Sequence, residues 1–158
     1  MSSDYINLEF KSGSTFDILT LAASARGQRA TGGVIEEAAL IDGQLLSEVI
    51  IPMMNIPRKL SKGGSNPEEP HAQQIYITSA GPKTTFAYER LIELLIQECI
   101  SPDDVFVCGA GYELPMYYGL FDKKIIEDQK LSSSFSSDGF ARESMSVWTG
   151  SSNESWFN

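Results

Sequence analysis

The chain has 158 residues, of which 42% are hydrophobic and 21% charged, a composition typical of a folded domain and not of a disordered segment. Its 12 basic and 21 acidic residues give a net charge of −9, which excludes an evenly basic nucleic-acid-binding surface but not a local basic patch. Two cysteines and one histidine are too few for a disulfide framework or a structural zinc site. Because we find no signal-peptide pattern and no long apolar run, we expect the chain to act in the cytoplasm.

The first elements expected along the chain are a β-hairpin and a short strand. Residues 5–10 alternate apolar and polar side chains, residues 11–14 supply a turn, and residues 15–21 are rich in β-formers. Small residues and glycines then lead into residues 33–38, where two branched apolar side chains indicate a short buried strand.

Helical spacing of apolar residues predicts a helix over residues 42–54, which Pro52 is expected to end or kink. Residues 55–73 hold three of the seven prolines and should form a surface loop. A further strand is expected at residues 74–78, followed by a turn at Gly81.

A second long helix is expected to begin at Thr84 or Thr85, either of which can act as its N-cap. Residues 101–104 should end this helix, and residues 105–108 are predicted to form another strand. The last elements are two helical stretches, at residues 122–130 and 138–148. Strands that alternate with helices indicate an α/β fold.

Two adjacent acids, Glu36 and Glu37, follow the predicted strand at residues 33–38. In nucleotide-hydrolysing α/β sheets, ligands bind at the carboxyl ends of strands, where a first acid holds Mg²⁺ and a second orients the attacking water. The pattern is therefore compatible with Glu36 at a metal and Glu37 as general base. Two solvated acids at a strand end are the other interpretation.

Arg26 and Arg29 flank a glycine upstream of these acids. Guanidinium groups in such a loop can bind a phosphate and stabilise the charge that develops during phosphoryl transfer. Solvated surface arginines would look the same in the sequence.

Hydroxyl side chains follow the predicted strand at residues 74–78, at Thr78 and Ser79. Hydroxyls at a strand end can contact a γ-phosphate or its water, but they also commonly bond to local backbone groups. The glycine at position 81 allows a sharp turn directly after them.

We find no phosphate-binding P-loop, which requires G-x-x-x-x-G-K-[ST]. The nearest approach spans residues 77–84, but Ile77 and Pro82 occupy both glycine positions, and a proline has no amide to donate to a phosphate. Lys83 therefore stands outside a functional loop.

These segments, in this order, resemble the large terminase subunit of tailed bacteriophages and prophages, the motor that packages DNA into procapsids. The resemblance covers nearly the whole chain, through residues 25–29, 33–42, 49–54, 74–81, 85–89 and 140–148. It implies part of a P-loop ATPase fold of the additional-strand type, in which helices flank the sheet and a small helical lid subdomain follows.

The resemblance also implies roles for individual residues. Glu36 and Glu37 correspond to the Walker B acids, so that Glu36 would reach Mg²⁺, directly or through water, and Glu37 would be the general base. Arg26 lies where the family places a trans-acting arginine finger, with Arg29 as the next choice. The coupling motif, which links hydrolysis to movement, corresponds to Thr78, Ser79 and Ala80.

The implied cofactors are ATP and Mg²⁺. The implied partners are the remainder of the large subunit, the small terminase subunit, the portal protein and double-stranded DNA, in a homo-oligomeric motor that works in the bacterial host cytoplasm without a membrane. Local basic residues in the proline-rich loop would contact the DNA: Arg58, Lys59 and Lys62.

The resemblance divides the chain into three parts. Residues 1–121 would be the C-terminal part of the ATPase domain, residues 122–150 the lid, and residues 151–158 a linker towards a nuclease domain. The phosphate loop would lie upstream of Tyr5 and the nuclease beyond Asn158, so we expect a fragment, such as a split gene product or a prophage remnant. We therefore expect no ATPase activity from this chain alone.

Two other interpretations stay open. The chain can be a non-catalytic interaction module that uses the terminase scaffold to bind a partner of the motor. It can also be a divergent nucleotide-binding enzyme that uses residues 81–85 as a degenerate phosphate loop, although Pro82 argues against this.

Overall fold

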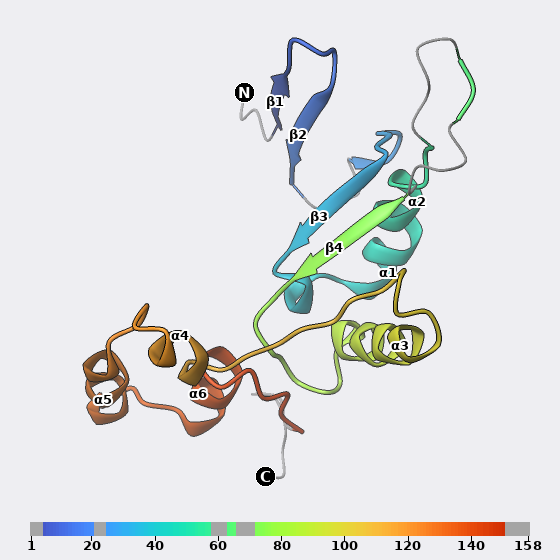
Figure 1. The fold of residues 1–158 in the computed structure, drawn as a ribbon. Coiled ribbons are helices and arrows are strands. Elements are labelled where there is room, and N and C mark those ends of the chain that lie inside the picture. Colours follow the sequence, from blue (N-terminus) through green and yellow to red (C-terminus); the bar gives the residue numbers. More distant parts are fainter. Residues whose placement is uncertain (1–4, 21–24, 58–62, 66–71, 151–158) are drawn as a thin grey trace. The chain divides into compact units, whose positions relative to one another are not determined.

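The computed structural model describes residues 5–20, 25–57, 63–65 and 72–150, and these form a mixed α/β structure with two-stranded sheets and several helices (Figure 1). The chain divides into two compact units that interleave along the sequence. The first unit comprises Met1–Glu36 and Ile41–Tyr76, and the second comprises Glu37–Leu40 and Ile77–Asn158. None of the described helices combines the length and the apolarity that crossing a membrane requires.

The first unit begins with the predicted hairpin, which the structure confirms. Strand β1 (Tyr5–Glu9) pairs antiparallel with β2 (Thr15–Leu19). The turn is closed by a hydrogen bond in which the Phe10 amide donates to the Ser14 carbonyl at 2.9 Å, and Gly13 adopts a left-handed φ of 81°. One face of the hairpin carries five apolar side chains that are each about half exposed: Ile6, Leu8, Phe10, Phe16 and Ile18.

The other sheet consists of β3 (Gly32–Glu36) and β4 (Gln73–Ile77), which lie side by side and run in the same direction (Figure 1). Both strands were expected near these positions. Ile35 is 2% exposed, whereas its neighbour Val34 is 54% exposed. The predicted buried strand is therefore buried on one face only.

The predicted helix over residues 42–54 forms as one helical run with an irregular middle. It comprises α1 (Gly43–Leu45), the π-helical segment η3 (Leu46–Ile50) and α2 (Ile51–Met53). Pro52 has no amide, and just before it the Ile51 amide donates to the Leu46 carbonyl in the wider π pattern. The helical run and β3 supply the most deeply buried side chains of this unit: Ile35, Leu46, Ile50 and Met54.

The described residues of the second unit form the short η2 (Ala38–Leu40) and four α-helices: α3 (Phe86–Ile100), α4 (Glu113–Tyr117), α5 (Lys123–Leu131) and α6 (Ser137–Glu143). Helix α3 begins after Thr85, as predicted. The Thr85 hydroxyl, however, donates to the Pro82 carbonyl at 2.8 Å and does not cap the helix. Phe140 of α6 is buried against the rings of Tyr112 and Phe135, with ring-centroid distances of 5.6 and 5.7 Å.

Two expectations for the second unit are wrong. Residues 105–108 do not form a strand, because no described segment pairs with them; the Val107 amide instead donates to the Glu98 carboxylate at 3.2 Å. Helix α6 ends at Glu143 and not at Trp148. The chain after it pairs with another segment, since the Lys83 amide donates to the Thr149 carbonyl at 2.8 Å and the Thr149 amide to the Gly81 carbonyl at 3.1 Å.

Candidate functional site

A cavity of about 280 Å³ in the second unit is the candidate functional site. Three segments that are distant in the sequence form its walls: the residues directly after β3, those directly after β4, and the end of α6. The lining residues are Glu37, Ala39, Leu40, Ser79, Ala80, Gly81, Pro82, Arg142 and Glu143. The volume suits a phosphate group with its surrounding waters better than a whole nucleotide, since ligand pockets usually exceed about 300 Å³.

The first wall begins with Glu37, one of the residues singled out from the sequence. Glu37 immediately follows β3, is exposed, and has a φ of 52°, in the left-handed region that costs a non-glycine residue about 1–2 kcal/mol. A strained backbone at such a position is often kept where it orients a functional side chain. The geometry therefore allows the Glu37 carboxylate to act on a ligand in the cavity.

The second wall contains two of the three residues of the suggested coupling motif, Ser79 and Ala80. Thr78 does not line the cavity, but its hydroxyl accepts a hydrogen bond from the Ala39 amide at 3.0 Å and donates to the Ser79 carbonyl at 3.0 Å. Thr78 thus connects the first two walls through a single side chain.

The third wall was not identified from the sequence. Arg142 and Glu143 end α6 and reach the same cavity as Glu37. The Arg142 guanidinium lies 3.5 Å from the Thr149 hydroxyl. Neither residue stands in a recognisable motif, and only their membership of the stretch at residues 140–148 could have drawn attention to them.

The remaining candidate residues belong to the first unit and do not line this cavity. Glu36 is the last residue of β3 and is exposed. Arg26 forms an ion pair with Glu48 at 3.6 Å, in which both side chains are more than half exposed, so the pair contributes little to stability. Arg29 donates to the neighbouring Gln28 carbonyl at 2.9 Å.

The three basic residues suggested for DNA contact, Arg58, Lys59 and Lys62, lie outside the described residues, as does the expected linker at residues 151–158.

The side chains around the cavity fit a phosphate and its metal ion in their chemistry. Within the described residues, no three histidine, cysteine or acidic side chains converge as a metal site. Mg²⁺ does not require such a cluster, because it keeps several waters and is commonly bound by one or two carboxylates together with phosphate oxygens. Glu37 and Glu143 supply carboxylates at the cavity, and Arg142 supplies a planar donor suited to phosphate.

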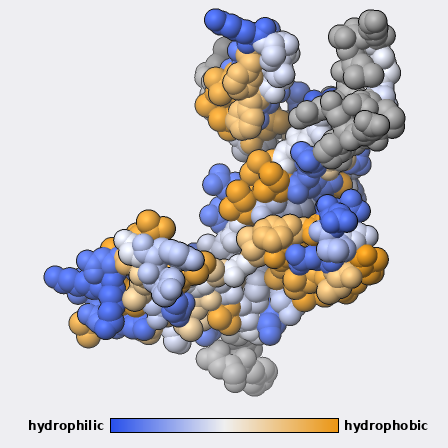
Figure 2. Space-filling view, viewed as in Figure 1, coloured by the Kyte–Doolittle hydropathy of each residue, from blue (hydrophilic) through white to orange (hydrophobic). Residues whose placement is uncertain are grey.

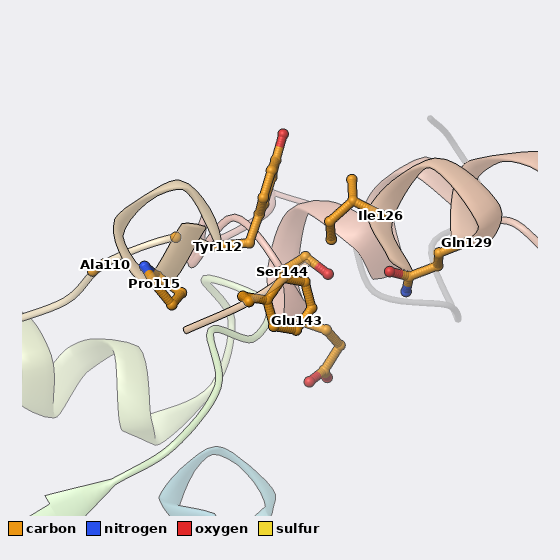
Figure 3. Close-up of a pocket in the computed structure, with 9 residues that line it drawn as sticks. Ala110, Tyr112, Pro115, Ile126, Gln129, Glu143 and Ser144 are labelled. Carbon is orange, nitrogen blue, oxygen red and sulfur yellow. The ribbon is translucent and has the colours of Figure 1, made fainter. Parts of the chain in front are cut away.

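A second cavity of about 370 Å³ lies beside α4, α5 and α6 (Figure 3). Its walls include the Tyr112 ring, Pro115 and Ile126, with Gln129 from α5 as a polar group, and Glu143 lines this cavity as well as the first. It contains none of the residues singled out from the sequence.

The chain matches no protein-family model, and no curated protein or solved structure is detectably similar to it.

Proposed function

We propose that this chain carries the hydrolysis side of an ATP site in a DNA-packaging motor of the large terminase type. One observation carries the proposal: a single cavity is lined by Glu37 and by Ser79 and Ala80, which the sequence resemblance had assigned to one reaction although they lie in different segments. The resemblance itself supplies the remaining parts of the proposal, including the additional-strand P-loop fold, the action in the bacterial cytoplasm and the packaging of double-stranded DNA.

In this proposal Glu37 orients the attacking water and accepts its proton, a role that commonly contributes 10²- to 10⁴-fold to a rate. Bound MgATP would supply the phosphoryl group and the cation that neutralises its charge. The role of Glu36 as a ligand of that cation comes from the resemblance alone, since Glu36 does not line the cavity. The hydrogen bonds of Thr78 to the Ala39 amide and the Ser79 carbonyl give a physical route by which a change at one wall reaches the other.

The phosphate loop would come from another segment or another chain, as would the nuclease. Arg26, or else Arg29, would act on the ATP site of a neighbouring subunit in the homo-oligomeric ring. The small terminase subunit and the portal protein are the proposed partners of the assembled motor.

The test begins with the reading frames that flank this one. A preceding frame that encodes a P-loop would be coexpressed with this chain, and ATP turnover would be measured for each part and for the combination. We expect turnover only in the combination, and a loss of about 100-fold or more in Glu37→Gln. Glu127→Gln is the matched control, because Glu127 lies on α5 in an exposed pair with Lys123. ATP hydrolysis by the isolated chain that Glu37→Gln abolishes would contradict the proposal.

A second candidate function is a non-catalytic interaction module that binds a partner of the packaging motor. The apolar face of the β1–β2 hairpin favours it, since five half-exposed apolar side chains on one small sheet are typical of an interaction surface. Figure 2 shows this hydrophobic area over the hairpin. Under this function Phe16→Asp weakens binding to the portal or motor proteins, whereas Glu37→Gln leaves the binding intact.

A further inference from the structure

Arg142 is placed at the candidate site by α6 and is not neutralised there. Its partly buried side chain lines the same cavity as Glu37 and Ser79. Among the described residues no carboxylate lies within ion-pair distance of its guanidinium, and the Thr149 hydroxyl lies 3.5 Å from it. Most donors of the guanidinium fork therefore remain available to a ligand.

The segment after α6 is bonded to the chain that forms the second wall of the cavity. The backbone of Thr149 is bonded on both sides to residues 81–83, at 2.8 and 3.1 Å. Trp148 packs against Tyr88 of α3, with ring centroids 5.4 Å apart. The Thr149 hydroxyl, 3.5 Å from the guanidinium, thus belongs to a segment that is bonded to the chain directly following Ser79 and Ala80.

We propose that Arg142 is a phosphate-binding residue that acts within its own subunit, on the phosphate chain of the nucleotide. The proposal rests on the proposed function and adds to it a cation supplied in cis, distinct from Arg26 and Arg29. A guanidinium binds phosphate oxygens through two parallel hydrogen bonds, and a partly buried one does so more strongly than an exposed one.

The charges of the cavity determine which form of phosphate it accepts. Among the described residues that line the cavity, Arg142 is the one basic side chain, whereas Glu37 and Glu143 are both acidic. A bare phosphate anion therefore meets net repulsion, and a phosphate chain that carries Mg²⁺ does not. We expect binding to require the metal ion.

The experiment titrates the full chain with inorganic pyrophosphate, with and without Mg²⁺, by calorimetry and by the amide signals of residues 79–81. We expect binding in the presence of Mg²⁺ that Arg142→Gln weakens at least tenfold and Arg142→Lys weakens less. Lys123→Gln, which removes an exposed positive charge on α5, should leave the affinity unchanged. A parallel titration with MgADP distinguishes a nucleotide site from a site for free phosphate. We expect MgADP to compete with pyrophosphate. Pyrophosphate binding that MgADP does not displace would contradict the assignment to a nucleotide.

Equal affinity of wild type and Arg142→Gln, an equal loss in Lys123→Gln, or the absence of any binding by the wild type would overturn the assignment of Arg142. Because Arg142→Lys keeps the charge and the aliphatic stem, it distinguishes a lost contact from a lost fold. The readout does not depend on turnover. If pyrophosphate binding depends on Arg142 but the coexpressed pair has no ATPase activity, the motor function is refuted and this inference stands. If the pair has activity that depends on Glu37 but pyrophosphate binding does not depend on Arg142, this inference is refuted and the motor function stands.

Discussion

The side-chain oxygen of Thr78 accepts a hydrogen bond from the backbone amide of Ala39 at 3.0 Å, across 39 positions of sequence. This bond joins the residues that follow β3 to those that follow β4, and both segments line the candidate cavity. It is a side-chain contact that holds together the two segments with predicted chemical roles.

Replacement of Thr78 by valine should lower the free energy of unfolding by about 1 kcal/mol, because the Ala39 amide loses its partner while the side-chain shape is kept. Thr78→Ser keeps the hydroxyl and should lose less. Urea denaturation of the three proteins measures the difference. Equal stability of the valine and serine variants would show that the hydrogen bond does not contribute.

The left-handed backbone of Glu37 gives a prediction that separates strain from chemistry. Glu37→Gly and Glu37→Ala both remove the carboxylate, but only glycine adopts a φ of 52° without steric cost. We expect the glycine variant to be more stable than the alanine variant by about 0.5–1 kcal/mol, and both to lack catalytic function in the coexpressed pair. Thermal and urea unfolding measure the comparison, and an alanine variant at least as stable as the glycine variant would contradict it.

Two neighbouring glycines of β3 should respond differently to the same substitution. A Cβ atom at Gly32 would lie 2.8 Å from the Gln73 carbonyl oxygen of β4, whereas one at Gly33 would lie 2.7 Å from the Met54 sulfur. Backbone in a paired strand cannot move aside easily, but a methionine side chain can change its rotamer. We expect Gly32→Ala to cost about 2–3 kcal/mol of stability and Gly33→Ala about 1 kcal/mol or less.

Chemical denaturation followed by far-ultraviolet circular dichroism measures both glycine variants. If Gly33→Ala is the less stable of the two variants, the Met54 side chain does not move aside by a change of rotamer, and the prediction is wrong.

Local patterns in the sequence were sufficient to predict the secondary-structure elements that are determined by neighbouring residues. The alternation of apolar and polar residues and a glycine turn predicted the β1–β2 hairpin. Helical spacing of apolar residues predicted α3, including its start after Thr85. Residues 105–108 have equally good β-formers but no paired segment among the described residues, so intrinsic propensity gave a strand that does not form.

The candidate site was predictable only in part, because a cavity depends on contacts between distant segments. Glu37 and Ser79 carried local signals, since an acid and a hydroxyl each follow an apolar strand. Arg142 carried none: it reaches the cavity because α6 ends at Glu143 and the following residues bond to the backbone at residues 81–83. No periodicity or motif within α6 encodes that pairing.

The interleaving of the two units has a consequence for synthesis on the ribosome. Glu37–Leu40 emerge with the first unit but belong to the second, whose other residues begin at Ile77. Every residue of the first unit is therefore translated before the residues of the second unit that η2 contacts. The cavity cannot form until its third wall, at the end of α6, has also been translated. A ribosome that stalls between Tyr76 and Arg142 would leave Glu37 attached to a nascent chain in which the candidate site has not yet formed.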